Sequence, residues 1–250
     1  MTLSNRKILR TLLCLLAGTL YAVCLSACDA KEPLSENRDA EIESPVIAND
    51  LSNQKVTAIA EDTQGHIWIG TFRGLNKNNV HDYHQYFCTD DSLGLPDNQI
   101  THLLRDSKNR FWVGTVNGVC LYTDKDNFRI IPIEADNKNV RQILEDRNGR
   151  IFLNTGFQLY AYHPREEKIT CVLPEISPGN AFYAQCHIAP DNNLWVMTST
   201  GLRCYDPSTL QLKESVALNG YPYYSYLHNN ELWITGNHTL SIFDTRTRSF

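Results

Sequence analysis

The stretch HIWIGTFRGL, residues 66–75, returns 44 residues later as RFWVGTVNGV, residues 110–119. Both copies contain Trp-x-Gly-Thr-x-x-Gly, and both follow an acidic turn. Alignment on the tryptophan reveals five copies, whose anchoring aromatics are Trp68, Trp112, Phe152, Trp195 and Trp233. A repeat of about 40 residues, rich in β-branched and aromatic positions with turn residues between them, is typical of β-propeller blades. The sequence therefore predicts an all-β propeller over residues 49–250, with about five four-stranded blades.

Each part of the first copy has an expected structural role. Residues 56–60 are apolar on both alternating faces, as in a strand that is covered on both sides. In the turn that follows, Asp62 is expected to accept bonds from backbone amides and Gly65 to take a positive φ. Trp68 supplies apolar area between blades, and Gly70 lets another backbone come close. The recurring carboxylates are interpreted as turn formers rather than an acid–base pair: Asp62, Asp106, Asp146 and Asp191.

Residues 1–28 have the pattern of an export signal. Basic residues near the start precede an apolar stretch, ending at Ser26, that is short for a membrane span. The segment closes with LSAC, which resembles the lipobox of bacterial lipoproteins, where Cys28 is the lipidated residue. The alternatives are an ordinary signal peptide or an uncleaved signal anchor with a chance cysteine. Residues 29–48 are polar and acidic and are predicted to form a flexible linker, so that the rest of the chain is exported.

Charge and motifs argue against several classes of function. The formal net charge is −5 and no Lys/Arg-rich block is present, so no nucleic-acid partner is expected. His81 and His84 are interpreted as surface residues of an outer strand, where residues three apart face opposite sides. No phosphate-binding loop, nucleophile elbow or supported Ser/His/Asp arrangement is visible. We therefore expect no cofactor, no metal and no catalytic step in this chain.

The cysteines beyond residue 28 do not define a disulfide framework. They are odd in number, with no CxxC pair and no zinc-ligand spacing: Cys88, Cys120, Cys171, Cys186 and Cys204. Cys120, Cys186 and Cys204 lie in apolar, strand-like runs, where cysteine is usually a small buried hydrophobe. One disulfide is compatible with this set but not required by it.

The repeat resembles a known family. The pattern D-x-x-G-x-[IL]-W-[IV]-G-T-x-x-G-L, preceded by N-x-[IV]-x-x-[IL], is similar to the two-component regulator propeller repeat. The stretch GLPDNQITHLLRDSKNRFWVGTVNGVCLY, residues 94–122, holds nearly the whole pattern. The resemblance covers about residues 56–245, and the last two copies are degenerate. It implies the periplasmic sensor part of Bacteroidetes hybrid two-component histidine kinases, which detect oligosaccharides and induce polysaccharide-degradation genes.

The resemblance also implies seven-bladed propellers, followed by a membrane helix and a histidine kinase core. Because the sequence stops at Phe250 with about five blades and no kinase motif, we expect it to be the front of a longer polypeptide or a truncated product. The expected partners are an oligosaccharide, a second copy or a further propeller domain, and a membrane. Attachment to that membrane is expected through the N-terminal signal or lipid, or through a missing C-terminal helix.

A ligand site is predicted by blade topology. In a four-stranded blade, the turns after the second strand and the links between blades share one face, and loop faces carry binding. Aromatic, amide and guanidinium groups suit a sugar, whose C–H faces stack while its hydroxyls need donors and acceptors. The candidate ligand-binding residues on this face are Phe72, Arg73, Asn98, Asn117, Phe157, Tyr221, Tyr223 and His238.

Two other functions are compatible with the sequence. One is a stand-alone exported propeller lipoprotein that acts as a protein-binding scaffold. The other is an exported propeller enzyme such as a lyase or glycosidase. A downstream frame encoding a membrane helix and a kinase would favour the sensor, and turnover of a polysaccharide would favour the enzyme.

Overall fold

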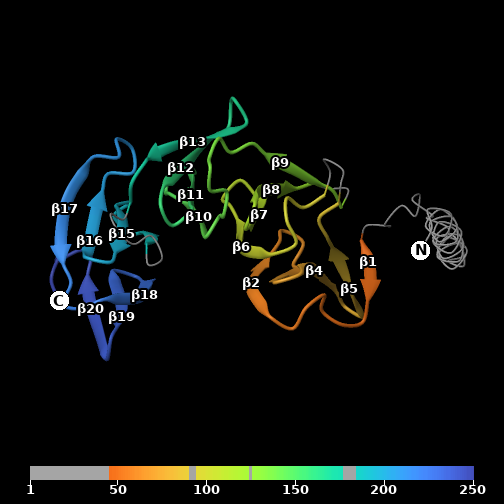
Figure 1. Ribbon diagram of the computed structural model, residues 1–250, viewed down its shortest axis with the longest axis horizontal. Helices are drawn as coiled ribbons and strands as arrows, with labels where there is room; N and C mark the ends of the chain where they lie inside the picture. Colours follow the sequence, from red (N-terminus) through yellow and green to blue (C-terminus); the bar gives the residue numbers. More distant parts are fainter. Residues whose placement is uncertain (1–44, 90–93, 124–125, 177–183) are drawn as a thin grey trace, which may run out of the picture. The chain divides into compact units, whose positions relative to one another are not determined.

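A computed structural model describes residues 45–89, 94–123, 126–176 and 184–250. These residues belong to one compact unit spanning Glu43–Phe250. Within the described ranges every regular element is a β-strand, and the strands form five antiparallel sheets (Figure 1). The all-β prediction is confirmed. The predicted export signal, its lipidation at Cys28 and residues 29–44 of the predicted linker lie outside the described residues.

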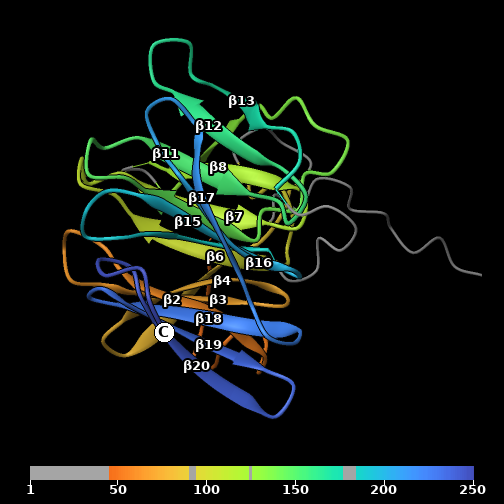
Figure 2. The ribbon, with the colours of Figure 1, turned by 90° about the vertical axis from the view of Figure 1, so that its left-hand side faces the viewer.

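Apart from β1, the strands of each sheet form a meander in which consecutive strands lie side by side (Figure 1 and Figure 2). The first blade contains β2 (Val56–Glu61), β3 (Ile67–Thr71), β4 (Gly74–Asn79) and β5 (Asp82–Tyr86), and β1 (Val46–Ala48) pairs with the outer edge of β5. The second blade contains β6 (Ile100–Arg105), β7 (Phe111–Thr115), β8 (Gly118–Tyr122) and β9 (Phe128–Ile131). The third contains β10 (Gln142–Glu145), β11 (Ile151–Asn154), β12 (Leu159–His163) and β13 (Lys168–Leu173).

The last two blades follow the same order. The fourth contains β14 (Gln185–Ile188), β15 (Leu194–Thr198), β16 (Gly201–Tyr205) and β17 (Leu212–Ala217). The fifth contains β18 (Pro222–His228), β19 (Glu231–Gly236) and β20 (Thr239–Asp244). Two details therefore differ from the prediction. The fifth sheet has three strands rather than four, and the end of the predicted linker forms β1, consistent with the β-branched pair Val46 and Ile47.

The anchoring aromatics are the main contacts between blades. Trp68 packs edge-on against Tyr122 of the second blade, with ring centroids 4.6 Å apart. Trp112 meets Tyr162 of the third blade in the same way at 4.9 Å. At these two contacts between blades, the aromatic on the second strand thus meets the aromatic at the end of the third strand of the next blade. The remaining pairs are Phe152 with Tyr205, which share one core cluster, and Trp195 with Phe243, at 5.1 Å.

The first glycine of the repeat makes room for the next blade. A Cβ atom on Gly70 would lie 2.6 Å from Cγ2 of Ile100, on the first strand of the second blade. A Cβ on Gly114 would lie 3.1 Å from Cγ1 of Val140, in the link to the third. The second glycine has another role, because Gly74 has a φ of +111° in the turn after β3. The carbonyl oxygen of Gly74 accepts a bond from the Thr71 hydroxyl at 2.8 Å.

The repeated aspartate is more than a turn former. Asp106 accepts bonds from the amides of Lys108 and Arg110, and its other oxygen accepts the indole N–H of Trp112 at 2.8 Å. Asp62 and Trp68 repeat this arrangement at 2.9 Å. The aspartate thus connects the turn to the buried tryptophan.

The fourth blade departs from the predicted pattern. The position six residues before Trp195 is Ala189, and Asp191 instead accepts bonds from Asn193 within its own turn. The indole Nε1 of Trp195 is buried without a hydrogen-bond partner. The prediction that Asp191 recurs with Asp62, Asp106 and Asp146 is therefore wrong in register, although Asp191 does form a turn.

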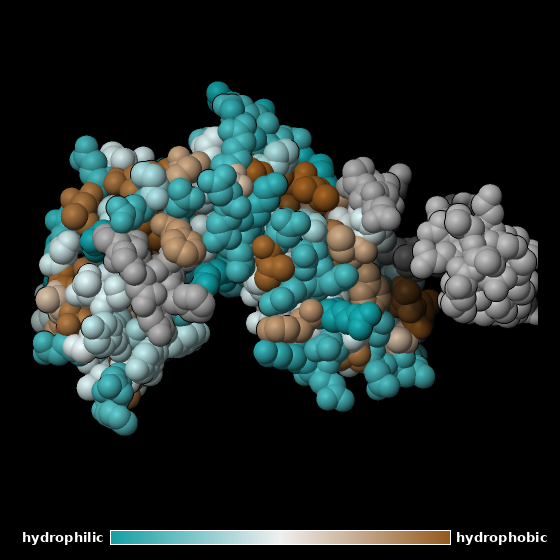
Figure 3. Space-filling model, in the orientation of Figure 1, coloured by the Kyte–Doolittle hydropathy of each residue, from teal (hydrophilic) through white to brown (hydrophobic). Residues whose placement is uncertain are grey.

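Three further features concern the buried cysteines, the absence of a membrane-spanning helix among the described residues, and the surface. Cys120, Cys186 and Cys204 are buried between strands, as predicted, and none of these three forms a disulfide. No helix among the described residues is long and apolar enough to cross a membrane. On the side of the molecule drawn in Figure 3, apolar residues form small patches separated by hydrophilic ones.

Candidate functional site

The loop face predicted from topology exists. The amide of Gly74, in the turn after β3, donates to the carbonyl of Asn98 in the link to the second blade at 2.7 Å. In the third blade, the amide of Ile176, beyond β13, donates to the carbonyl of Phe157 in the turn after β11 at 3.0 Å. Second-strand turns and interblade links are therefore neighbours.

The predicted ligand-binding residues do not gather at one point of this face. Asn98 lies beside the turn that carries Phe72 and Arg73, and Lys55 places its ammonium 3.7 Å from the centre of the Phe72 ring. The carbonyl of Tyr221 approaches Gly236, next to the turn that carries His238. Asn117 and Phe157 are exposed on separate turns of separate blades, and Tyr223 is exposed on β18. As a ligand site, this set remains a prediction.

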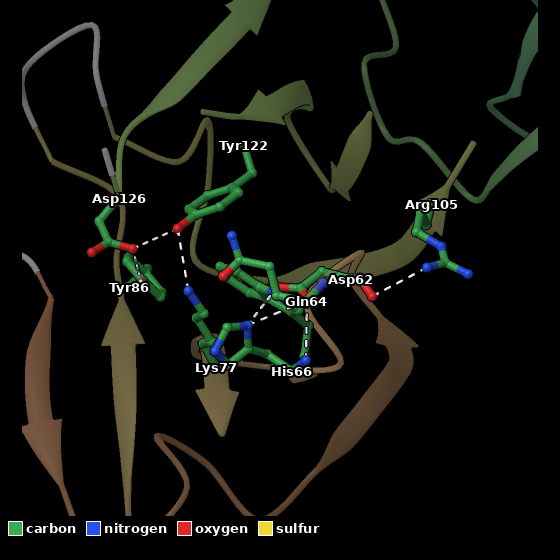
Figure 4. A network of polar contacts seen from close by, with 9 residues as sticks. Asp62, Gln64, His66, Lys77, Tyr86, Arg105, Tyr122 and Asp126 are labelled. Carbon is green, nitrogen blue, oxygen red and sulfur yellow. Dashed lines mark hydrogen bonds and ion pairs between the residues drawn. The ribbon is translucent and has the colours of Figure 1, made fainter. Parts of the chain in front are cut away.

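A pocket of about 220 Å³ lies instead among the turns of the opposite loop face, between the first two blades. It is lined by the turn after β2, by β4, by β6 and its following turn, and by the ends of β7 and β8. Figure 4 shows the polar network around it. The lining residues are Asp62, Thr63, Gln64, Lys77, Arg105, Asn109, Phe111, Tyr122 and Asp126.

One end of the pocket is organised by Asp126. The same oxygen of this carboxylate accepts the hydroxyl of Tyr122 at 2.6 Å and that of Tyr86 at 2.7 Å. Burial alone would raise the pKa of Asp126, but the two hydroxyl bonds and the charge of Lys77 outweigh it and lower that pKa. Burial, together with the hydrogen bond to Asp126, raises the pKa of both tyrosines. The carboxylate is therefore ionised at neutral pH, with both hydroxyls protonated and fixed in direction.

The other end is organised by Asp62. Its carboxylate holds the Trp68 indole and the amides of Gln64 and His66, and Nδ1 of His66 lies 3.1 Å from Oδ2. Burial raises the pKa of Asp62, but these bonds outweigh it and lower the pKa overall. Arg105 of the second blade donates to the Asp62 carbonyl at 3.1 Å.

Lys77 connects the two ends of the pocket. Its ammonium lies 3.4 Å from the Tyr122 hydroxyl and 5.4 Å from the centre of the Trp68 ring. The ammonium is thus held by one tyrosine oxygen and by the face of a buried indole, which attracts a cation through its quadrupole.

The chemistry of the pocket favours a neutral, polar ligand. Two cations, Lys77 and Arg105, balance two carboxylates, Asp62 and Asp126, so the lining carries no net charge. Side-chain amides supply both donors and acceptors, and the partly exposed Tyr122 supplies ring surface, whereas Phe111 is buried against Trp68. The volume is below the roughly 300–1,000 Å³ of sites that enclose a drug-sized ligand, so one ring of a larger molecule fits it better than a whole oligomer. Among the described residues, no group of three or more His, Cys, Asp or Glu side chains is placed to hold a metal ion.

The residues of this pocket do not stand out in the repeat alignment, for an identifiable reason. Lys77 and Asp126 occupy positions that do not repeat from blade to blade, so alignment of the copies hides them. The available signal was Tyr122, because an aromatic closes the third strand in four of the five copies: Tyr122, Tyr162, Tyr205 and Phe243.

Acid should weaken the seam between the first two blades, by which we mean the contact surface between two neighbouring blades. The groups responsible are the carboxylates of Asp62 and Asp126. Because the folded-state pKa values of Asp62 and Asp126 are lowered, their stabilisation is present above the unfolded-state pKa of about 3.9 and is lost as the pH falls through the folded-state values. Urea titrations between pH 7 and pH 3 should show a smaller loss of stability in Asp126→Asn than in the wild-type protein. An identical pH dependence in both proteins would contradict the assignment.

Comparison with known proteins supports the repeat assignment. Residues 50–73 and 94–117 match the family model described as two component regulator propeller. These two stretches contain the second-strand tryptophans of the first and second blades and most of the turns that line the pocket. No curated protein matches the chain in sequence.

Several solved structures share the fold at low identity. Virginiamycin B lyase from Staphylococcus aureus is 16% identical with a TM-score of 0.57, over 80% of this chain and 73% of the lyase. PorZ, a surface component of the type-IX secretion system of Porphyromonas gingivalis, is 15% identical with a TM-score of 0.58, over 81% and 34%. The extracellular domain of BT4673 from B. thetaiotaomicron, described as a hybrid two component system, is 15% identical with a TM-score of 0.49, over 78% and 36%. The chain thus spans about a third of that domain, and the likeness to the lyase and to PorZ, with TM-scores above 0.5, concerns the β-propeller fold alone.

Proposed function

Because this chain carries two-component regulator propeller repeats, we propose that it is the ligand-sensing part of an exported, membrane-associated two-component sensor, and that its ligand is an oligosaccharide. The observation that supports the proposal most directly is that the matched repeats supply most of the residues that line the pocket. The first matched repeat supplies Asp62 and Gln64, and the second supplies Arg105, Asn109 and Phe111. The family repeats therefore build the seam at which the ligand would bind.

A sugar ring suits this lining for chemical reasons. Its hydroxyls both donate and accept, which matches the amides of Gln64 and Asn109 and the charged groups of Lys77 and Arg105. Its C–H face packs on an aromatic ring, and the partly exposed ring of Tyr122 is the one that the lining offers. Since Tyr122 donates its proton to Asp126, its oxygen is left to accept a bond from Lys77 or from a sugar hydroxyl.

A pocket between blades also suits a sensor. A ligand shifts a protein between two arrangements only if it binds one of them better. Here the ligand would contact β4 of one blade and β6–β8 of the next, so its binding energy depends on how the two blades sit together. A signal would then pass through the seam rather than through a change inside either sheet.

Calorimetry with a panel of plant and host oligosaccharides tests this function. Gln64→Ala and Lys77→Met should each weaken binding by about tenfold, or ~1.4 kcal/mol, because each removes a polar contact while the exposed turn or the packed lysine stem remains. Phe72→Ala and Arg73→Ala are matched controls on the opposite loop face and should bind as the wild type does. Chromatography of the recovered glycan should show that it is unchanged, as expected of a sensor rather than a lyase or glycosidase.

Two results would count against the proposal. If no oligosaccharide in the panel binds, the ligand class is wrong. If the Phe72 and Arg73 variants lose affinity while the pocket variants keep it, the ligand occupies the loop face predicted from topology.

A further inference from the structure

One position of the repeat carries a shorter side chain in the first blade than in the two blades that follow. In each of these blades an aspartate bonds to the residue four positions later, which is His66, Arg110 or Arg150. Nδ1 of His66 lies 3.1 Å from Oδ2 of Asp62, and Nε of Arg110 lies 2.6 Å from Oδ2 of Asp106. The bond to the aspartate is thus kept, and the side chains differ in how far they extend beyond it.

In the second and third seams the arginine extends across the space between the blades. The guanidinium carbon of Arg110 lies 5.2 Å from the centre of the Trp112 ring and 5.3 Å from that of Tyr162 in the third blade. Nη2 of Arg150 donates to the hydroxyl oxygen of Ser208, in the third-strand turn of the fourth blade, at 3.3 Å. A guanidinium stacks well on aromatic faces, so in these seams it fills the space beside the anchoring aromatic.

The first seam holds a cation on the equivalent pair of rings, but a different strand supplies it. Nζ of Lys77, on β4, lies 5.4 Å from the centre of the Trp68 ring and 5.5 Å from that of Tyr122. These distances are close to those of Arg110 in the second seam, where the position equivalent to Lys77 is the buried Leu121. The first seam therefore keeps the cation on the rings without an arginine from the turn.

His66 leaves open the space that an arginine would fill. It bonds to Asp62 beside Gln64 (Figure 4), but it is not among the residues that line the pocket. The pocket extends from this turn to Asp126, in the third-strand turn of the second blade, which is the kind of turn that Arg150 reaches in the third seam. A short side chain where a long one stands elsewhere leaves a space unless its neighbours move in.

From this comparison we infer that His66 is the specificity-determining residue of the site. It makes the first seam the one that binds ligand, while arginine at the same position closes the second and third seams. The identity of the ligand rests on the proposed function, but the role of His66 in opening the pocket does not.

Placing the side-chain pair of the second seam in the first seam tests the inference. The double variant His66→Arg/Lys77→Leu reproduces Arg110 and Leu121, and Lys77→Leu alone is its matched reference, because it leaves the space unfilled. In calorimetry with an oligosaccharide that binds the wild type, Lys77→Leu should lose about tenfold in affinity, and the double variant should show no measurable binding. Arg110→His makes the converse exchange in the second seam and should bind as the wild type does.

Two measurements without ligand separate this inference from the proposed function. A crystal structure of the double variant should show the new guanidinium between the rings of Trp68 and Tyr122. The double variant should also unfold at a higher urea concentration than Lys77→Leu, because the guanidinium replaces the lost ammonium on these rings. If no oligosaccharide binds the wild type, the proposed function fails, and these two measurements still decide the role of His66.

Three results would overturn the inference. One is a double variant that binds oligosaccharide as tightly as Lys77→Leu does. Another is a guanidinium that points away from the two rings into solvent. The third is a double variant that unfolds at the same urea concentration as Lys77→Leu, because the space would then not be filled.

Discussion

Replacing Trp112 by alanine is expected to lower the free energy of unfolding by about 3–5 kcal/mol, the usual loss for a buried aromatic residue. Trp112 is fully buried in the core between the second and third blades, where it packs against Tyr162. The change leaves a cavity in that seam and removes the indole donor from the buried Asp106 carboxylate. Trp68→Ala should cost a similar amount in the seam between the first and second blades. Urea denaturation followed by circular dichroism measures both losses.

A pair of milder substitutions separates packing from hydrogen bonding. Trp112→Phe keeps most of the apolar area but takes one donor from Asp106, whereas Trp195→Phe removes an indole N–H that has no partner. The first should therefore cost about 1–3 kcal/mol more than the second, the penalty of a lost bond to a buried charged group. Equal losses would contradict a role for the aspartate–indole bond. If Trp112→Ala lowers the free energy of unfolding by less than about 1 kcal/mol, Trp112 is not buried between the second and third blades as described.

Asp106→Ala is expected to destabilise the protein by about 3–5 kcal/mol, because it removes one member of a buried, charged hydrogen-bonded group. The carboxylate has no exposed side-chain surface and forms an ion pair with Arg110, whose Nε lies 2.6 Å from Oδ2. Its removal leaves two turn amides, the Arg110 guanidinium and the Trp112 indole without their acceptor.

Asp191→Ala is the matched control for this prediction. Asp191 occupies a turn at the same edge of the fourth blade, but it is exposed and bonds only to Asn193 among the contacts described. Its loss should cost about 1 kcal/mol or less, because Asp191 is exposed and water can replace it as the acceptor of the two bonds from Asn193. Comparable losses for the two variants in urea titration would contradict the distinction drawn between them.

The sequence predicts the scaffold better than the site, and the residues show why. Trp68 recurs as an aromatic because every seam needs a bulky filler, and Thr71 recurs in the first four blades because its hydroxyl closes the turn after the second strand. Gly70 has a counterpart only in Gly114, since Asn154 and Met197 take its place in the third and fourth blades. The aspartate–indole bond was also readable, since Asp62 and Asp106 each precede their tryptophan by six residues. Counting along the fourth copy would have shown Ala189 at that distance, and hence that Asp191 is out of register.

The pocket did not follow from the repeat because its composition is not periodic. Lys77 and Asp126 come together only through the pairing of β4 with its neighbours and the packing of β8 beside Trp68, neither of which a repeat alignment contains. Second-strand turns and interblade links share a face, as blade topology predicts. Topology does not distinguish which of the two loop faces binds a ligand, since both are built from polar turn residues.

Hydrogen exchange measured by mass spectrometry, with and without a bound oligosaccharide, tests most directly whether the ligand occupies the seam between the first two blades. Binding there should slow exchange of the amides in the turns at residues 62–66 and 105–111, while the turns that carry Phe72, Asn117 and Phe157 exchange as before. Protection confined to those latter turns, with none at residues 62–66 and 105–111, would contradict the account.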